Sequence, residues 1–531
     1  MTDRRLKLLA LTAFMGALAL MSASALAQLP DRTVNPNAAN EGIAKSLAQQ
    51  IGNGRGNTVT PGSSAFIIAR DPFRAVRRGR QIFQRKFTRL QGQGPLTTDI
   101  GGDIETTLII GAGLADSCAA CHGRPRGSAG AGGDVVTRPD SRDAPHLFGL
   151  GLKEMLADEI TDDLRDIRDD VARDADRENR TITRSLTSKG INYGNITANR
   201  FGQIDTSGVR GVDTDLRVRP FFLHGETISI REFLIGAFNA EMGLDSVDPE
   251  MREAAVNRAR FTTPSGMVLD GSRDRLEAPP TGSIFADPDG DGVRNEIPTS
   301  LVDFMEFYLL HYFKAGLGEQ NSSTAAGRSL FQSIGCATCH IPDLTIERDR
   351  RIADVETVFD PARGNPFNRM FATATPLLSE VNDGSGHPTL KRALRNSFVV
   401  RNIFTDFKRH DLGANFHEIN FDGTLRTQML TMALWGVGNT GPYGHDGRSM
   451  TLNDVILRHG GEAQTARNNF ANLSSTSRRN IIDFLNSLSL FPPDDTASNL
   501  DPGDRTAANY PQFGHGSIRL GALFNDPTDP E

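Results

Sequence analysis

Four cysteines and the two histidines that follow them carry the clearest chemistry in this 531-residue chain. All four cysteines belong to two copies of one pattern, Cys-x-x-Cys-His. Two cysteines at positions i and i+3 of a helical turn point the same way and can add to the vinyl groups of haem as thioethers, and the next residue then binds the iron. The pattern predicts two covalently bound c-type haems. Their attachment residues are Cys118, Cys121 and His122 for haem 1, and Cys336, Cys339 and His340 for haem 2.

Zinc is the main alternative cofactor for these cysteines. A CxxC pair alone is also typical of zinc sites and of thiol redox chemistry. One zinc ion bound by all four thiolates would, however, explain neither adjoining histidine. The duplication of the whole motif and the lack of any further cysteine favour haem.

The first 27 residues have the pattern of a secretory signal peptide. Three basic residues precede an apolar run over 8–21, and Ala25-Leu26-Ala27 forms a small-residue cleavage site before Gln28. A retained membrane anchor is the alternative, but the apolar run is short for a span. We therefore expect a periplasmic protein that has no membrane span after processing.

The composition describes an acidic globular protein with many loops. The formal charge of −7 argues against a nucleic-acid partner, which would require a basic surface. Hydrophobic residues make up only 38 % of the chain, and the chain holds 53 glycines and 27 prolines. Two buried porphyrins would add apolar bulk to such a lean core.

Segments around the two motifs repeat each other. Gly79–Gln84 before the first motif is similar to Gly327–Gln332 before the second, and Pro220–Phe233 after the first aligns without a gap with Pro442–Val455. In both later segments a turn leads to a helix N-cap, which is Ser229 in one and Thr451 in the other.

This repeat predicts a mainly α fold with two cytochrome-c-like haem domains and long loops. No sustained alternation long enough for a sheet is present. We expect the signal peptide at 1–27, an N-terminal haem domain at 28–290, a C-terminal haem domain at 291–492 and a tail at 493–531.

The repeat also predicts that the two irons have different ligands. His459 lies twelve residues after Gly447, on the helix that Thr451 caps, whereas the same offset from Gly225 falls on Ala237. Haem 2 is therefore expected to have two histidine ligands, His340 and His459, and haem 1 to lack the second one. Alternatively, His459 is only an exposed histidine at a helix end.

Further motifs connect this pattern to a known family. They are Arg142–Leu152, Thr405–Gly413, Leu434–Gly438 and Pro442–Arg448. With the two haem motifs, they make residues 70–490 resemble the bacterial di-haem cytochrome c peroxidase superfamily, which includes the di-haem enzyme that matures methylamine dehydrogenase. The chain is most similar to the branch often labelled di-haem oxidoreductase or thiol oxidoreductase.

The resemblance implies roles for two residues. Peroxidases of this superfamily have a methionine ligand fourteen residues after the histidine of the second turn, and fourteen residues after His445 lies His459. A histidine there would lower the reduction potential of that haem. The family places peroxide at haem 1 beside a glutamate, which Glu241 matches with a two-residue shift. Such a base accepts and returns the proton during O–O cleavage; an ordinary surface carboxylate is the alternative.

Two positions differ from the family pattern between the haems. The peroxidases usually carry a relay tryptophan where this chain has Leu223, and the one tryptophan here is Trp435. Trp435 either takes over the relay or packs beside haem 2. His410 and His445 lie in the family motifs, and we expect them to orient ligands or to bond haem propionates.

The distal side of haem 1 is the least determined part of the site. The loop after His122 has no obvious distal histidine and instead holds Arg124 and Arg126. His146 or His224 could still reach haem 1, and either residue would close the site.

A short acidic loop could bind calcium. Residues 287–292 match the start of an EF-hand loop, but position twelve is Pro298 rather than glutamate, so a complete loop is excluded. The predicted ligands are Asp287, Asp289 and Asp291, with Asn295 or Glu296 to complete a shorter cage. The superfamily binds calcium between its haem domains; the alternative is a plain acidic turn.

The leading prediction is a periplasmic di-haem oxidoreductase that reduces hydrogen peroxide at haem 1. A small redox protein, a cytochrome c or a similar donor, would deliver the electrons through haem 2. Alternatives are a maturation-type enzyme that oxidises a partner, and a two-haem electron carrier if His146 or His224 binds haem 1. Residues 154–178 hold eleven acids and four arginines, which predicts a solvated helix face or a docking patch for a basic partner.

Overall fold

The computed structural model describes most of the chain between residues 46 and 489. The described ranges are 46–70, 72–94, 115–123, 134–135, 142–312, 317–351, 353–359, 370–376, 378–382, 388–392, 397–420 and 423–489. The expected signal peptide, the tail, Arg124 and Arg126 lie outside them. Within these ranges no helix combines the length and the apolarity that a membrane crossing requires.

Helices around the first motif form one packed group. They are α2 (Leu47–Ile51), α3 (Ser64–Arg70), α4 (Pro72–Gln84), α6 (Cys118–His122), α8 (Ile230–Met242), α9 (Pro249–Asn257) and α10 (Thr299–Leu310), with the 3-10 turn η1 (Arg89–Gln91). Helix α4 crosses α10 at Gly79, where a Cβ atom would lie 2.2 Å from the Phe304 carbonyl oxygen. The crossing therefore requires a residue without a side chain.

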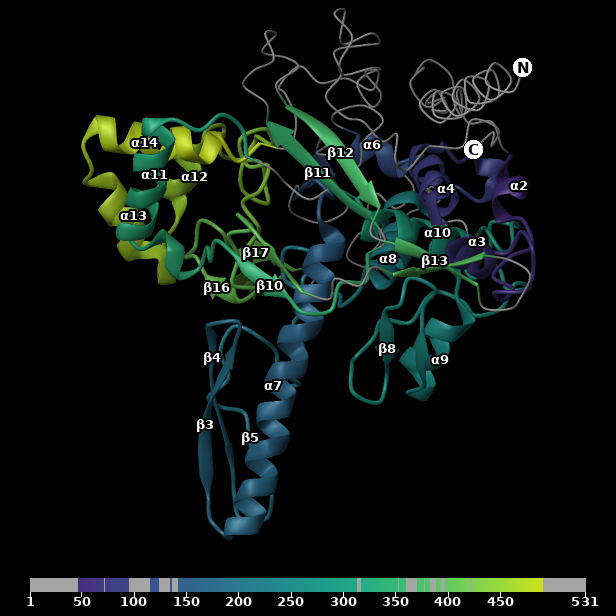
Figure 1. The fold of residues 1–531 in the computed structure, drawn as a ribbon, viewed down its shortest axis with the longest axis horizontal. Helices are drawn as coiled ribbons and strands as arrows, with labels where there is room; N and C mark the ends of the chain where they lie inside the picture. The colour runs from purple at the N-terminus through teal and green to yellow at the C-terminus, as the bar shows by residue number, and fades with distance from the viewer. Residues whose placement is uncertain are drawn as a thin grey trace, which may run out of the picture.

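A second group surrounds the second motif. It comprises α11 (Ser322–Ser333), η2 (Cys336–Thr338), α12 (Leu452–Arg458), η4 (Gly461–Ala463), α13 (Gln464–Ala471) and α14 (Ser475–Asn486). Helix α11 crosses α14 at Gly327, where a Cβ atom would lie 1.9 Å from the Asn480 carbonyl oxygen. The two groups lie on opposite sides of the molecule in Figure 1, and each uses the glycine that the repeat places at the same point.

The turn before each capped helix is also repeated. Phe221 pairs with Thr227 and Tyr443 pairs with Ser449 in isolated antiparallel bridges, at the same offset along the chain. The predicted N-caps are confirmed: the Ser229 side chain accepts a hydrogen bond from the Glu232 amide, and that of Thr451 accepts one from the Asp454 amide. The sequence repeat thus corresponds to a structural repeat.

Helix α10 packs with the helices around the first motif. Residues 297–312 contribute many side chains to the core of the first group, including Phe304 and Tyr308. The predicted domain boundary at 290/291 lies before this helix and stays a prediction.

A projecting arm corrects the expectation that the chain forms no sheet. Helix α7 (Leu150–Glu178) runs away from the body, and β3 (Ile182–Ser188), β4 (Ile191–Ala198) and β5 (Ile204–Asp205) lie along it (Figure 1). The three strands form an antiparallel sheet in the order β3-β4-β5. Leu186, Tyr193 and Ile196 are buried against α7, while the intervening serines, threonines and asparagines weaken the apolar alternation that would reveal the strands.

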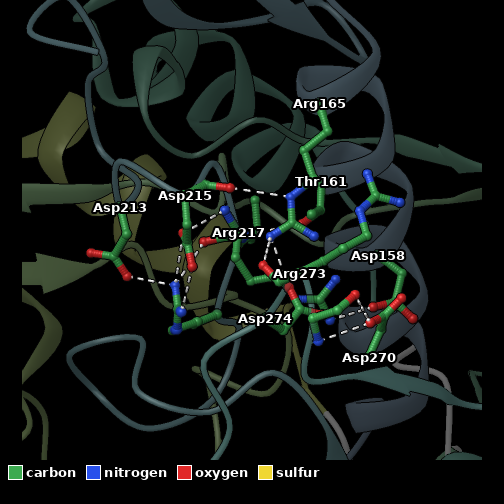
Figure 2. A network of polar contacts seen from close by, with 12 residues as sticks. Asp158, Thr161, Arg165, Asp213, Asp215, Arg217, Asp270, Arg273 and Asp274 are labelled. Atoms are coloured by element: carbon green, nitrogen blue, oxygen red, sulfur yellow. Dashed lines mark hydrogen bonds and ion pairs between the residues drawn. The ribbon is translucent and has the colours of Figure 1, made fainter. Parts of the chain in front are cut away.

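Ion pairs join the middle of α7 to the body. Arg165 donates to Asp274 at 2.8 Å, and Arg217 donates to Asp158 at 2.7 Å (Figure 2). The Arg165 and Asp274 side chains are almost fully buried. The first half of the acidic helix is thus an internal element, and its second half carries the solvated carboxylates.

Short two-stranded pairings make up the other strands. The antiparallel pairs are β1 (Asp134–Val135) with β2 (Arg142–Asp143), β7 (Arg260–Thr262) with β8 (Val268–Asp270), β10 (Leu344–Ile346) with β15 (Phe398–Val400), β11 (Ala353–Phe359) with β12 (Met370–Pro376), β13 (Leu378–Asn382) with β14 (Pro388–Arg392), β16 (Arg409–Asp411) with β19 (Gln428–Leu430), and β17 (Glu418–Ile419) with β18 (Leu425–Arg426). The pair β6 (Ser246–Val247) and β9 (Ile297–Pro298) is parallel.

Candidate haem sites

One cavity of about 840 Å³ contains both cysteine motifs in its wall. All six predicted attachment residues line it, from α6 in one half and from η2 and the residues after it in the other. His459, Ala237 and Glu241 also line this cavity. The structure therefore brings together every residue that the sequence assigned to haem 1 and haem 2.

The three predicted iron ligands share one hydrogen-bond arrangement. The Nδ1 atom of His122 bonds the Pro145 carbonyl oxygen at 2.7 Å. In the second half, Nδ1 of His340 bonds the Phe404 carbonyl at 3.1 Å, and Nδ1 of His459 bonds the Val455 carbonyl at 2.7 Å. A histidine that donates from Nδ1 to a carbonyl presents a basic Nε2 to a metal. This donor set fits two haem irons.

The thiols fit covalent attachment better than a shared zinc ion. Burial raises the pKa of the Cys118 and Cys336 thiols to about 12, which opposes the thiolate that zinc needs. Among the described residues, only one cluster of potential metal ligands contains a cysteine. That cluster consists of Cys339, Asp406 and His410, so it includes a single cysteine. The zinc alternative requires four cysteines around one ion, which this arrangement does not provide.

The position of His459 is fixed by the end of helix α12 and by the Phe416 ring. It is the C-cap residue of α12, immediately after the last helical residue. The preceding Arg458 donates to Asp446 at 2.8 Å, and its guanidinium lies over the Phe416 ring. The Phe416 ring also packs against the His459 ring, with centroids 5.1 Å apart. The turn that contains Asp446 thus fixes the end of the helix and the histidine on it.

His410 holds the segment that follows His459. Its Nδ1 bonds Glu462 and its Nε2 bonds Asp406, both at 2.8 Å. Hydrogen bonds and charge from these carboxylates, opposed by desolvation, raise the pKa of His410 to about 11. His410 thus links Asp406 to Glu462 beside Cys339; ligand orientation and propionate binding stay the two predicted roles of this residue.

In the first half, Ala237 of α8 lines the cavity at the repeat position that corresponds to His459. Ala237, Glu241 and Met242 of α8 line the cavity. The sulfur of Met242 lies 3.9 Å from that of Cys118, and the charge of Glu241 contributes to raising the pKa of the Cys121 thiol. Glu241 is half-buried beside the first motif rather than on an open surface.

The two histidines that could close haem 1 are engaged elsewhere. His146 uses both ring nitrogens: Nε2 donates to the Trp435 carbonyl at 2.9 Å and Nδ1 accepts the Phe148 amide at 3.3 Å. His224 bonds Glu418 through Nε2 at 2.5 Å and is absent from the cavity wall. These bonds use both nitrogens of His146 and Nε2 of His224; a ligand role for either residue at haem 1 stays a prediction.

Trp435 is a buried packing residue in the cavity wall. Only 2 % of it is exposed, and its ring lies so close to Gly149 that a Cβ atom there would be 2.7 Å away. Leu223, where the peroxidases carry a relay tryptophan, lines the same cavity. The packing alternative for Trp435 accounts for these contacts; a relay role stays a prediction.

Sequence reasoning missed two residues near this cavity. Glu418 contacts both turn histidines, with 2.5 Å to His224 and 3.1 Å to Nε2 of His445, and so links the two repeats. Lys153 is buried in the cavity wall, where desolvation lowers its pKa to about 8. Glu418 lies outside the repeated motifs, so no local pattern indicated it, and Lys153 follows a family motif by one residue.

Comparison with known families bears on the second half of the chain. Residues 367–488 match the family model described as "di-haem oxidoreductase, putative peroxidase". The match supports the di-haem oxidoreductase family. The matched segment contains His459 and the second turn and begins after both cysteine motifs. A search of curated proteins found no match.

Proposed function

We propose that this protein is a periplasmic di-haem c-type oxidoreductase that reduces hydrogen peroxide at haem 1 with electrons relayed through haem 2. When bound, the two haems supply the redox chemistry. One observation supports unequal roles for them: equivalent positions of the repeat present His459 to the cavity in one half and Ala237 in the other. A small redox protein is the proposed electron donor.

The protein side chains prepare the two sites differently. In the second half, the Val455 and Phe404 carbonyls orient the imidazoles of His459 and His340, the two residues that would hold the haem 2 iron. In the first half, the Pro145 carbonyl orients the imidazole of His122. A group with an open position can bind a small oxidant, whereas a group with two protein ligands transfers electrons only.

Glu241 is the proposed proton carrier at haem 1. It lies four residues after Ala237 on α8, and therefore on the same helix face, which lines the cavity. There it can accept the proton of a bound peroxide and return it to the leaving oxygen.

Peroxide turnover of the purified protein tests this function. With a reduced small cytochrome c as donor, the wild-type protein should consume peroxide, and Glu241→Gln should lower kcat by about 100-fold. The control Glu253→Gln changes an exposed carboxylate of α9 and should leave kcat unchanged. If the protein neither turns over peroxide nor contains a high-spin haem when oxidised or half-reduced, it is an electron carrier and the proposal is wrong.

A further inference from the structure

A buried lysine lies in the wall of the shared cavity. Lys153 is only 7 % exposed, and it lines the cavity together with Leu150, which lies three residues before it on α7. Residues three apart share one face of a helix, so the start of α7 turns this face toward the cavity. The Lys153 ammonium group lies 5.8 Å from the centroid of the Phe221 ring, which lines the same cavity. A cation therefore lies in a wall made mostly of apolar side chains.

This ammonium group differs from the other buried cations that pack on α7. Arg165 of the same helix pairs with Asp274 at 2.8 Å, and Lys189 pairs with Glu159 at 2.6 Å. Among the residues that the structure describes, no carboxylate forms an ion pair with Lys153, and burial is the one cause that moves its pKa. Burial of a charge is unfavourable unless an anion compensates it. The cavity side of Lys153 thus suits a negatively charged group.

The neighbouring histidine does not carry this charge. Burial, reinforced by the charge of Lys153, lowers the pKa of His146 to about 3. The Nδ1 atom of His146 also accepts a hydrogen bond from the Phe148 amide, which requires an unprotonated nitrogen. His146 is therefore neutral. Burial lowers the pKa of Lys153 to about 8, so its side chain is still mainly charged at neutral pH, and an anion beside it would raise that pKa.

The surroundings of this lysine belong to the first haem site. Phe221, the ring beside the ammonium group, is part of the core cluster against which Cys118 and Cys121 pack. The Pro145 carbonyl oxygen, which bonds Nδ1 of His122, comes from the residue just before His146. The group that would lie closest to the lysine is therefore haem 1, and a haem carries two propionate carboxylates.

We propose that Lys153 is a positioning residue that forms an ion pair with a propionate of haem 1. The inference rests on the proposed binding of haem in the shared cavity, but not on peroxide chemistry. Lys153 would donate charge-assisted hydrogen bonds to the carboxylate and so hold that edge of the porphyrin beside α7. Its positive charge would also oppose the charge of ferric iron and thereby raise the reduction potential of haem 1.

Redox titration of the purified two-haem protein, followed by visible and electron paramagnetic resonance spectra, tests the pair. Lys153→Met keeps the length of the side chain and removes its charge. At pH 8 the equilibrium constant for reduction of haem 1 should fall about tenfold, because the ferric form is then opposed by one charge less. Lys153→Arg keeps the charge and should restore the wild-type value. The control Lys189→Met removes a lysine that lies outside the cavity wall, so both potentials should stay unchanged.

Infrared difference spectra of the oxidised and reduced protein identify the carboxylate. Growth on 5-aminolaevulinate with carbon-13 in its carboxyl group labels the haem propionates, which separates their bands from those of protein carboxylates. One propionate band should shift in Lys153→Met and should return in Lys153→Arg, because only the arginine can form charge-assisted hydrogen bonds to the carboxylate.

The outcomes separate this inference from the proposed function. A wild-type potential of haem 1, or unshifted propionate bands, in Lys153→Met would overturn the ion pair. Equal losses in Lys153→Met and Lys153→Arg would also overturn it, since packing rather than charge would then matter. A protein that binds no haem would overturn this inference together with the proposed function. Peroxide turnover enters none of these measurements, so the electron-carrier alternative is decided separately.

Discussion

The histidines near the cavity fall into two classes according to the hydrogen bonds of their ring nitrogens. His122, His340 and His459 each have Nδ1 on a backbone carbonyl. His410 has carboxylates on both nitrogens. The first arrangement suits an iron ligand, and the second suits a charged residue that holds other groups in place. The chemistry of each histidine thus follows from its neighbours rather than from its residue type.

Removal of the His459 imidazole should open the second site. We expect His459→Ala to convert haem 2 to a high-spin form that binds cyanide, because His340 would then be the one predicted protein ligand left for this iron. Electron paramagnetic resonance of the oxidised protein checks this. His417→Ala is the control, since His417 bonds Asp411 at 2.8 Å and lies outside the cavity wall. An unchanged low-spin signal in His459→Ala would show that another residue is the ligand.

Glu232 should make stability depend on pH. Desolvation raises its pKa to about 7 from an ordinary value near 4.5. The folded state favours the protonated side chain, so its stabilising contribution is complete below pH 4.5 and is lost as the pH rises through 7. Urea unfolding should therefore show a smaller decline of the unfolding free energy between pH 5 and pH 8 in Glu232→Gln than in the wild type. Glu253→Gln, exposed on α9, should keep the wild-type decline; an equal decline in Glu232→Gln would contradict the prediction.

At the residue scale, the sequence was most informative where chemistry imposes a fixed spacing. Cysteines at i and i+3 with a histidine next to them define an attachment motif locally, and the structure places all six residues on one cavity. Asp245 could not be assigned in the same way. It joins the acidic loop because the β6/β9 pairing brings together segments that are 51 residues apart, and no local pattern encodes that pairing.

At the scale of elements, the repeated helix crossings carry much of the fold. Gly79 and Gly327 both lie where a helix passes the backbone of another too closely for a side chain. The repeat in the sequence predicted the two helices and their caps, because these depend on local signals. It did not predict the β3–β4 hairpin, whose strands bury only part of one face against α7 and are otherwise polar.

Substitution of the second crossing glycine should separate its two helices. A Cβ atom in Gly327→Ala would lie 1.9 Å from the Asn480 oxygen and 2.8 Å from the Phe484 Cβ. We expect a loss of about 1–3 kcal/mol in the free energy of unfolding, which is typical of overpacking. Thermal unfolding followed by circular dichroism measures it. In the control Gly236→Ala on α8, a Cβ atom meets nothing within 4 Å, so stability should stay the same or rise. Equal effects of the two variants would contradict the close crossing.

For the molecule as a whole, the shared cavity and the arm are separate features joined through α7. The first residues of α7 lie beside the cavity, where Leu150 and Lys153 form part of its wall. Its later residues extend along the sheet of the arm (Figure 1). The Trp435 carbonyl, which bonds His146, connects the segment before α7 to the second half. Long-range contacts of this kind, like the Glu418 link between repeats, cannot be derived from residue spacing.

The buried ion pairs at the middle of α7 should stabilise the molecule without affecting the haem chemistry. Asp274 lies 2.8 Å from Arg165 and also near Arg217, and all three side chains are almost fully buried (Figure 2). Asp274→Asn would leave two buried guanidinium groups with less negative charge, so we expect it to cost about 3–5 kcal/mol of unfolding free energy. Urea unfolding provides the measurement.

The exposed pair between Asp170 and Arg173 on the same helix supplies the matched control. Asp170→Asn should change the unfolding free energy by less than about 1 kcal/mol, because solvent screens that pair. Neither Asp274 nor Asp170 lines the cavity, so peroxide turnover at a temperature where both variants are folded should equal that of the wild type. A loss of turnover in Asp274→Asn without a loss of stability would contradict this prediction. The ion pairs would then influence the cavity through α7 rather than stabilise the fold.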